Sequence, residues 1–338
     1  MIVSRAPLRV SLFGGGSDYK SFFHKKTGSV LGCSISKYVY VSLSSLPSFS
    51  SELIRLTYRQ TESVNSISEI QHPVVREMFL DSKIADRLNI ATMSDISGGT
   101  GLGGSSAFTV ALKSSLNKFL GISNDPVSLA NYAVKIEREK LRESGGWQDQ
   151  YHCSVGGFRE YKFSNRGVQV SDPLISDDTL AKLSRNFFLF SIGETRFSSI
   201  MATATEEISS THDGIKNLEE LAKLSSLTAD KIKQTKDFDN LIEIISSALN
   251  ASWSLKRNFG PQVAPSNVDI LIAKGLSSGA IAAKLCGAGG AGFILFMVPE
   301  NLSIKCRQAL GVEKTLDFSF TPNGAQTWEL AGDRRDWS

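Results

Sequence analysis

Glycine and serine residues between positions 98 and 106 form the stretch whose chemistry is easiest to name. The sequence GGTGLGGSSA places bare backbone directly before the apolar pattern of a helix that begins near Ser105. Successive backbone N–H groups in a glycine-rich loop, continued by the positive end of a helix dipole, bind anions such as a triphosphate. The stretch therefore predicts a phosphate-binding loop, and a flexible loop before a serine-capped helix is the alternative.

The glycine spacing also matches other nucleotide-binding motifs, but their context is missing. Gly99, Gly101 and Gly104 satisfy G-x-G-x-x-G. A dinucleotide-binding fold needs a buried apolar strand before these glycines, whereas NIATMSDIS is largely polar. No Lys-Ser or Lys-Thr follows the glycines, as a Walker A loop requires, and neither HRD nor DFG of the protein kinases occurs.

Two further glycine clusters lie near the two ends of the chain. APLRVSLFGGGSDY (6–19) ends a strand pattern in glycines followed by Asp18, and KLCGAGGAGF (284–293) leads into another strand pattern. Each cluster alone is compatible with a tight turn. Together with the stretch 98–106, they predict backbone segments that approach one ligand from several sides.

Alternating strand and helix patterns surround these clusters and must position them. A helix is expected from Ser105 to a stop at Gly121, and a second from an Asp125 cap to Gly145-Gly146. Strands are expected at 37–43, 187–193 and 292–299, and helices at about 217–232 and 238–258. The polar, turn-rich SDPLISDDT predicts a domain boundary between residues 175 and 187.

Composition places the 338-residue chain among globular proteins, with 41% hydrophobic residues and a formal charge of +3. The sequence has no block of five or more like charges, so nothing in it indicates a nucleic-acid partner. The N-terminus lacks a secretory signal and no long apolar stretch occurs, so we expect a cytoplasmic protein without a membrane partner. The spacing of the cysteines and histidines argues against structural zinc and a disulfide framework.

In this order, the three glycine clusters resemble the three motifs of the galactokinase, homoserine kinase, mevalonate kinase and phosphomevalonate kinase (GHMP) superfamily. The triple-glycine first motif, with IERE (136–139), QDQY (148–151) and SWSLKR (252–257), is most similar to the D-glycero-D-manno-heptose 7-phosphate kinase branch, with fucokinases nearby. Galactokinases carry a glutamate where this chain has Gly15, and the heptose branch usually has glycine where this chain has Ala291.

The resemblance implies an α+β, two-domain GHMP kinase fold with the active site in the cleft between the domains. The N-terminal domain, with the phosphate loop and the catalytic residues, would span residues 1–180, and the C-terminal domain residues 181–338. The implied cofactors are ATP and Mg²⁺. The implied ATP-binding residues are Gly98, Gly99, Gly101, Leu102, Gly103, Gly104, Ser105 and Ser106.

The resemblance also assigns catalytic and substrate-binding roles. Ser106 and Glu137 would hold Mg²⁺, while Asp149 would orient or deprotonate the acceptor hydroxyl with Arg9 as its cationic partner. Arg196 is favoured over Lys256 and Arg257 as the residue that receives a substrate phosphate. The implied substrate-binding residues are Gly15, Gly16, Ser17, Asp18, Arg196, Gly287, Gly289 and Gly290.

The expected reaction is ATP-dependent phosphorylation of a small-molecule sugar or sugar phosphate. The favoured acceptor is the anomeric hydroxyl of D-glycero-D-manno-heptose 7-phosphate. A kinase for the 1-position of L-fucose or a related sugar is one alternative, and a catalytically silent regulator that binds sugar or nucleotide is another. The triple-glycine first motif disfavours mevalonate or homoserine as the acceptor.

Overall fold

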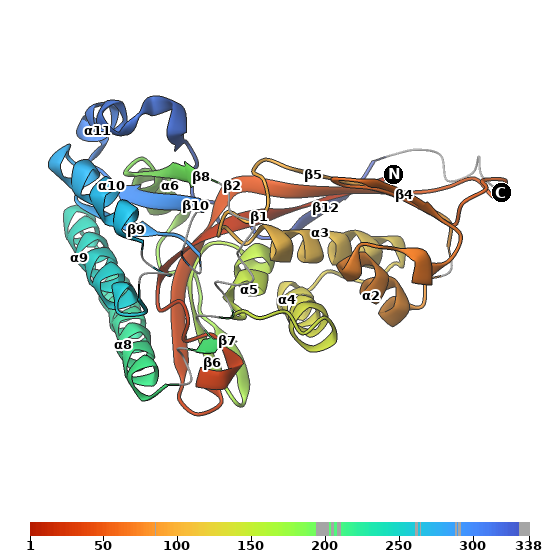
Figure 1. Cartoon of the computed structure of the whole chain (residues 1–338), viewed down its shortest axis with the longest axis horizontal. Helices are drawn as coiled ribbons and strands as arrows, with labels where there is room; N and C mark the ends of the chain where they lie inside the picture. The colour runs from red at the N-terminus through yellow and green to blue at the C-terminus, as the bar shows by residue number, and fades with distance from the viewer. Residues whose placement is uncertain are drawn as a thin grey trace.

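The structure is a computed structural model that describes residues 1–84, 86–193, 203, 206–207, 211–260, 263, 265–287, 289 and 292–330. Within these ranges the chain forms two β-sheets with helices packed around them (Figure 1). The larger sheet has the strand order β12-β1-β2-β5-β3-β4, and β6 joins it by pairing with β2 and with β7. Its strands are β1 (Ile2–Phe13), β2 (Gly28–Ser45), β3 (Ile54–Thr57), β4 (Thr61–Val64), β5 (Leu88–Ser94), β6 (Phe158–Ser164), β7 (Gly167–Val170) and β12 (Gln326–Glu329).

The long strand β2 joins two parts of this sheet. Residues 28–33 of β2 pair with β6, and residues 39–45 pair with β5. The expected strand at 37–43 is therefore the second half of a longer strand. The first half of β2 is buried on both faces, so polar and apolar residues do not alternate there. The alternating pattern typical of a strand therefore does not extend to this half.

The helices of the N-terminal half pack below the larger sheet in Figure 1, and α3 and α5 contact β1 directly. Between α4 and α5 the chain makes a π-helical turn, η2. These elements are α1 (Lys20–Phe23), η1 (Ile67–Glu69), α2 (Pro73–Ser82), α3 (Gly104–Phe119), α4 (Pro126–Val134), η2 (Lys135–Lys140) and α5 (Gln148–Val155).

The smaller sheet has the order β11-β8-β10-β9 among the described residues. Its strands are β8 (Phe187–Gly193), β9 (Ala282–Leu285), β10 (Gly292–Met297) and β11 (Thr315–Leu316). The remaining helices are α6 (Asp177–Ser184), α8 (His212–Gln234), α9 (Phe238–Arg257), α10 (Ser266–Ser277), η3 (Glu300–Leu302), α11 (Ser303–Leu310) and η4 (Val312–Lys314). The final strand, β12, returns to pair with β1, and the division near residue 180 stays a prediction.

Local sequence signals account for most of these boundaries. Helix α3 is followed by Gly121 in the left-handed region, and the Asp125 side chain caps α4 by accepting from the Ser128 N–H. The second helix does not run to Gly145-Gly146 as expected. Regular α-helix ends at Val134 and the π-helical turn ends at Lys140. Arg142 then takes a positive φ of 54°, so no helix continues through this residue.

The apolar core is continuous across the two sheets. Its main cluster includes Leu8 and Val10 of β1, Ala107 of α3 and Leu249 of α9. Strand β1 packs against helices from both halves of the chain. Arg9, which follows Leu8 on this strand, is therefore held where the two halves meet. None of the helices in the described ranges has the length and apolar composition that a bilayer span requires.

Candidate active site

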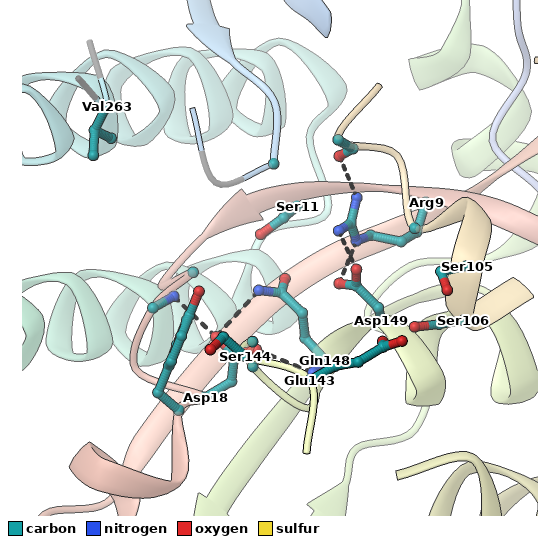
Figure 2. A pocket seen from close by; sticks show the side chains of 18 of the residues that line it. Arg9, Ser11, Asp18, Ser105, Ser106, Glu143, Ser144, Gln148, Asp149 and Val263 are labelled. Carbon is teal, nitrogen blue, oxygen red and sulfur yellow. Dashed lines mark hydrogen bonds and ion pairs between the residues drawn. The ribbon is translucent and has the colours of Figure 1, made fainter. Parts of the chain in front are cut away.

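A cavity of about 460 Å³ lies where the three glycine clusters meet. Figure 2 shows polar side chains on its wall that come from β1, from the turn after β1, from the start of α3, from the segment before α5 and from α5. Cavities of this size hold small ligands. The predicted site residues that line it are Arg9, Gly15, Gly16, Asp18, Gly99, Gly101, Gly103, Gly104, Ser105, Ser106, Glu137, Asp149 and Gly287.

Four predicted site residues lie beside the cavity rather than on its wall. Gly98 is exposed, and the Leu102 side chain is buried while its carbonyl accepts from the Arg9 N–H. The Ser17 hydroxyl is buried in the turn, where it donates to the Gly14 carbonyl at 2.7 Å. Gly289 packs against the Val263 backbone. Arg196, Gly290 and Ala291 lie outside the described residues.

Arg9 and Asp149 form a bidentate ion pair in the centre of the cavity wall (Figure 2). Arg9 Nε donates to Asp149 Oδ1 at 2.8 Å, and Nη2 donates to Oδ2 at 2.6 Å. The third guanidinium nitrogen, Nη1, donates to the Gly101 carbonyl at 2.7 Å. The arginine side chain is 5% exposed and the aspartate 22%, so the carboxylate keeps one accessible side. Arg9 thus ties the carboxylate of α5 to the loop before α3.

The loop at 98–106 has the conformation that its glycines predict. Gly99, Gly101 and Gly103 all have φ between 76° and 80°, a region that other residues rarely adopt. Gly103 is the N-cap of α3 and supplies no side chain to the first helical N–H groups. These N–H groups and the positive end of the α3 dipole face the cavity, which is the arrangement of an anion site.

The third glycine cluster packs directly on this loop. A β-carbon on Gly287 would lie 2.5 Å from the Gly101 Cα, and one on Gly292 would lie 2.3 Å from the Thr100 carbonyl oxygen. Both distances are shorter than any contact between a β-carbon and a non-bonded heavy atom, so these positions require glycine in this arrangement. The glycine pattern near the C-terminus therefore serves a backbone-to-backbone contact with the predicted phosphate loop.

Glu137 lies in the π-helical turn and points toward the start of α3. Its Oε2 accepts from Ser106 Oγ at 2.9 Å and from Gln150 Nε2 at 2.6 Å. Its Oε1 is buried and has no hydrogen-bond partner among the described residues. A buried carboxylate oxygen without a partner is costly unless a ligand satisfies it. In the part of the chain that the structure describes, no group of three or more His, Cys, Asp or Glu side chains forms a metal cluster.

Asp18 is fully buried beneath the turn that follows β1. Its Oδ1 accepts from the Gly16 N–H at 2.9 Å, and its Oδ2 accepts from the Gln148 N–H at 3.0 Å. Burial is the main cause that raises the Asp18 pKa above its usual range. Gly146 passes so close that a β-carbon there would overlap Asp18 Oδ2. Asp18 therefore joins the first glycine cluster to the start of α5.

Lys256 and Lys284 also line the cavity, although sequence reasoning had given Lys256 a lesser role and Lys284 none. Lys284 Nζ donates to the Leu12 carbonyl at 2.8 Å, and Lys256 Nζ donates to the Gly287 carbonyl. Burial lowers the pKa of Lys284 to about 7 and that of Lys256 to about 8. Its position in the sequence is the signal that could have identified Lys284, because this residue is the first of the third glycine cluster.

Residues 70–157 match the family described as the GHMP kinases N terminal domain. This segment contains the loop 98–106, Glu137 and Asp149. This segment of the chain is thus a GHMP kinase N-terminal domain. The resemblance inferred from the three glycine clusters is thereby confirmed, and a domain of this kind implies a phosphotransferase with ATP as the phosphoryl donor.

Known proteins match this chain over nearly its whole length. A D-glycero-alpha-D-manno-heptose 7-phosphate kinase of Campylobacter jejuni is 28% identical, with 97% of this chain and 99% of the relative covered. A crystal structure named as a D-glycero-D-manno-heptose 1-phosphate kinase from Bacteriodes thetaiotaomicron has a TM-score of 0.78 at 23% identity, covering 98% of this chain and 100% of the other. A putative sugar kinase from C. jejuni has a TM-score of 0.73 at 26% identity, covering 97% and 98%. These matches confirm the expected GHMP kinase fold.

Proposed function

We propose that this protein transfers the γ-phosphoryl group of ATP to a sugar or sugar phosphate. The favoured acceptor is the anomeric hydroxyl of D-glycero-D-manno-heptose 7-phosphate. The observation that carries the proposal is the Arg9 guanidinium, which pairs with both oxygens of Asp149 and also contacts Gly101. One side chain thereby links a carboxylate suited to an acceptor hydroxyl with a loop suited to phosphate. The heptose is supported by the name of the C. jejuni relative.

The loop before α3 is the proposed nucleotide end of the site. Backbone N–H groups from Gly101 to Ser106 would donate to the phosphate oxygens of ATP, and the α3 dipole would add to this attraction. Arg9 lies beside the same loop, where its positive charge stabilises the negative charge that spreads over the transferring group. The loop and Arg9 therefore act on the same part of the reaction.

The residues at the start of α3 fit Mg²⁺. The Ser106 hydroxyl and the unpartnered Oε1 of Glu137 are hard oxygen donors in adjacent positions, and Mg²⁺ needs only one or two protein ligands beside phosphate oxygens and water. When bound, the ion would neutralise phosphate charge and help to position the triphosphate. Gln150 and Ser106 hold Oε2 of Glu137, which leaves Oε1 free for this role.

Asp149 is the proposed acceptor end of the site. Its carboxylate would accept a hydrogen bond from the acceptor hydroxyl, orient the hydroxyl oxygen toward the γ-phosphorus and take up the proton during transfer. The bidentate contact with Arg9 fixes the plane of the carboxylate, so less conformational freedom is lost when the substrate binds. A purely binding protein would have no need of this pair beside a phosphate loop.

The decisive experiment is a panel of sugars and sugar phosphates, each incubated with ATP, Mg²⁺ and the purified protein. Phosphorus NMR of the products identifies the hydroxyl that receives the phosphate. We expect ATP consumption coupled to a sugar, with heptose 7-phosphate turned over best and phosphorylated at its anomeric position. If the protein binds ATP or a sugar but forms no phosphorylated product, it is the catalytically silent regulator. Equal turnover of free fucose or free heptose would remove the heptose phosphate assignment and leave a general sugar kinase.

A further inference from the structure

Besides Glu137 Oε1, two further buried polar atoms on the cavity wall have no hydrogen-bond partner among the described residues. They are the Ser11 hydroxyl oxygen on β1 and the Gln148 Oε1 at the first position of α5. The two residues are only 7% and 8% exposed, and both line the cavity. Buried polar groups are nearly always hydrogen-bonded, so an unpartnered pair that borders a cavity indicates a polar ligand.

The orientation of the Gln148 amide is fixed by its neighbours. Its Nε2 donates to Asp18 Oδ1 at 3.1 Å, and its backbone N–H donates to Asp18 Oδ2 at 3.0 Å. The amide nitrogen must face the carboxylate, because an amide oxygen there would meet another acceptor. Oε1 is consequently left as a free acceptor, and Figure 2 shows the Gln148 side chain between Asp18 and Asp149 with Ser11 nearby.

Gly15 keeps the space between these two side chains open. A β-carbon on Gly15 would lie 3.1 Å from Ser11 Oγ and 3.4 Å from Gln148 Nε2. Gly14 and Gly16 have positive φ values of 79° and 102°, which explains them as turn residues, but Gly15 does not. Since its backbone is open to other residues, the missing side chain at position 15 leaves room for a ligand.

We propose that Ser11, Gly15 and Gln148 form a subsite for a neutral hydroxyl group of the acceptor, next to the hydroxyl that Asp149 handles. This proposal rests on the proposed function and names a specificity device within it. Ser11 can donate and accept, and Gln148 Oε1 can only accept, which together match a sugar hydroxyl. The adjacent Asp18 carboxylate disfavours a phosphate at this place. Asp18 is then a positioning residue, because its oxygens already hold Gly16 and Gln148.

The test compares Ser11→Ala and Gln148→Met with wild-type protein on the best substrate of the panel. Loss of one hydrogen bond to a neutral hydroxyl should lower kcat/KM for the sugar roughly threefold to tenfold, with KM for ATP unchanged. Ser254→Ala, on an exposed position of α9, is the matched control and should leave both constants unchanged. Gly15→Ala should lower kcat/KM for the sugar by about tenfold or more, because its methyl group fills the subsite.

Monodeoxy analogues of the substrate separate a direct contact from a structural one. With the analogue that lacks the contacted hydroxyl, Ser11→Ala and wild type should have equal kcat/KM, while the other analogues keep the difference. The subsite is refuted if both variants match wild type on the natural acceptor, or if their losses are equal for every analogue. Wild-type turnover alone decides the proposed function. If another class of hydroxyl acceptor is phosphorylated instead, the same variants test the subsite with that acceptor.

Discussion

Gly287 lies against Gly101 so closely that a β-carbon on Gly287 would be 2.5 Å from the Gly101 Cα. This contact joins the C-terminal glycine cluster to the predicted phosphate loop. Gly287→Ala must push the loop away or distort its own backbone, where φ is 65°. We expect KM for ATP to rise at least about tenfold, since a displacement of about an ångström is enough for such a loss in a positioned site.

Gly121→Ala is the matched control for this prediction. Gly121 has a similar φ of 71°, but nothing lies within 4 Å of the position that its β-carbon would take. The control therefore carries the backbone strain without the contact, and should lower thermal stability while leaving KM for ATP unchanged. Steady-state kinetics and thermal unfolding of both variants check the prediction. Equal KM values for the two variants would show that the contact has no part in nucleotide binding.

Asp149→Asn should lower kcat by at least about a hundredfold while ATP binding stays nearly intact, because a positioned acid or base contributes on this scale. The amide cannot accept a proton and loses one of the two charged contacts to Arg9. Turnover is measured with the best substrate of the panel, and ATP affinity by calorimetry. Asp172→Asn, at an exposed position, is the control. A folded Asp149→Asn protein with near-normal turnover would exclude Asp149 as the catalytic carboxylate.

Ser106→Ala and Gly103→Val should differ in kind. Ser106→Ala removes one proposed Mg²⁺ ligand, so the Mg²⁺ concentration for half-maximal activity should rise while ATP still binds at high Mg²⁺. Gly103→Val should abolish ATP binding, because φ is 80° there and a β-carbon would lie 3.2 Å from Arg9 Cγ. Mg²⁺ titrations of activity and calorimetric ATP binding distinguish the two. Equal, mild effects would contradict the assignment of this loop to phosphate.

Lys284 should make stability depend on pH above neutrality. Burial lowers its pKa to about 7 in the folded protein from 10.5, so between these values the unfolded chain binds a proton that the folded chain lacks. The contribution of Lys284 to the free energy of unfolding should therefore rise with pH from about 7 and level off near 10.5. Urea unfolding of wild type and Lys284→Met at pH 7, 8, 9 and 10 measures the difference. A difference that is constant over this range would contradict the lowered pKa.

Glycine positions account for much of what the sequence could predict about the site. Left-handed backbone at Gly101 and Gly103 follows from residue type, because glycine alone adopts it without strain, and the helix after the loop follows from its apolar pattern. The roles of Arg9, Glu137 and Asp149 could be proposed only from the family resemblance. The neighbouring residues of each are those of an ordinary charged residue in a strand, a helix or a turn, so local sequence does not indicate a catalytic role.

Contacts between residues far apart in the sequence could not be predicted from local sequence patterns. The pairing of Arg9 with Asp149 joins residues 140 positions apart, and the contact of Lys284 with the Leu12 carbonyl joins residues 272 positions apart. The π-helical turn at 135–140 was also missed, since the residue types there equally suit an α-helix. Burial, which lowers the pKa of Lys284, exists only once both halves of the chain have packed.

The sequence by itself determined where glycine leaves the backbone without side chains, where several of the strands and helices lie, and which family the chain resembles, because these depend on residue types at neighbouring positions. Only the tertiary structure decided which groups share the cavity. It left Ser11 Oγ and Gln148 Oε1 without partners and placed Gly15 between the two side chains, although neither Ser11 nor Gln148 stands out in the sequence. The physical reason is that hydrogen-bond satisfaction and free space depend on every element packed around a group, and such packing has no local sequence signature.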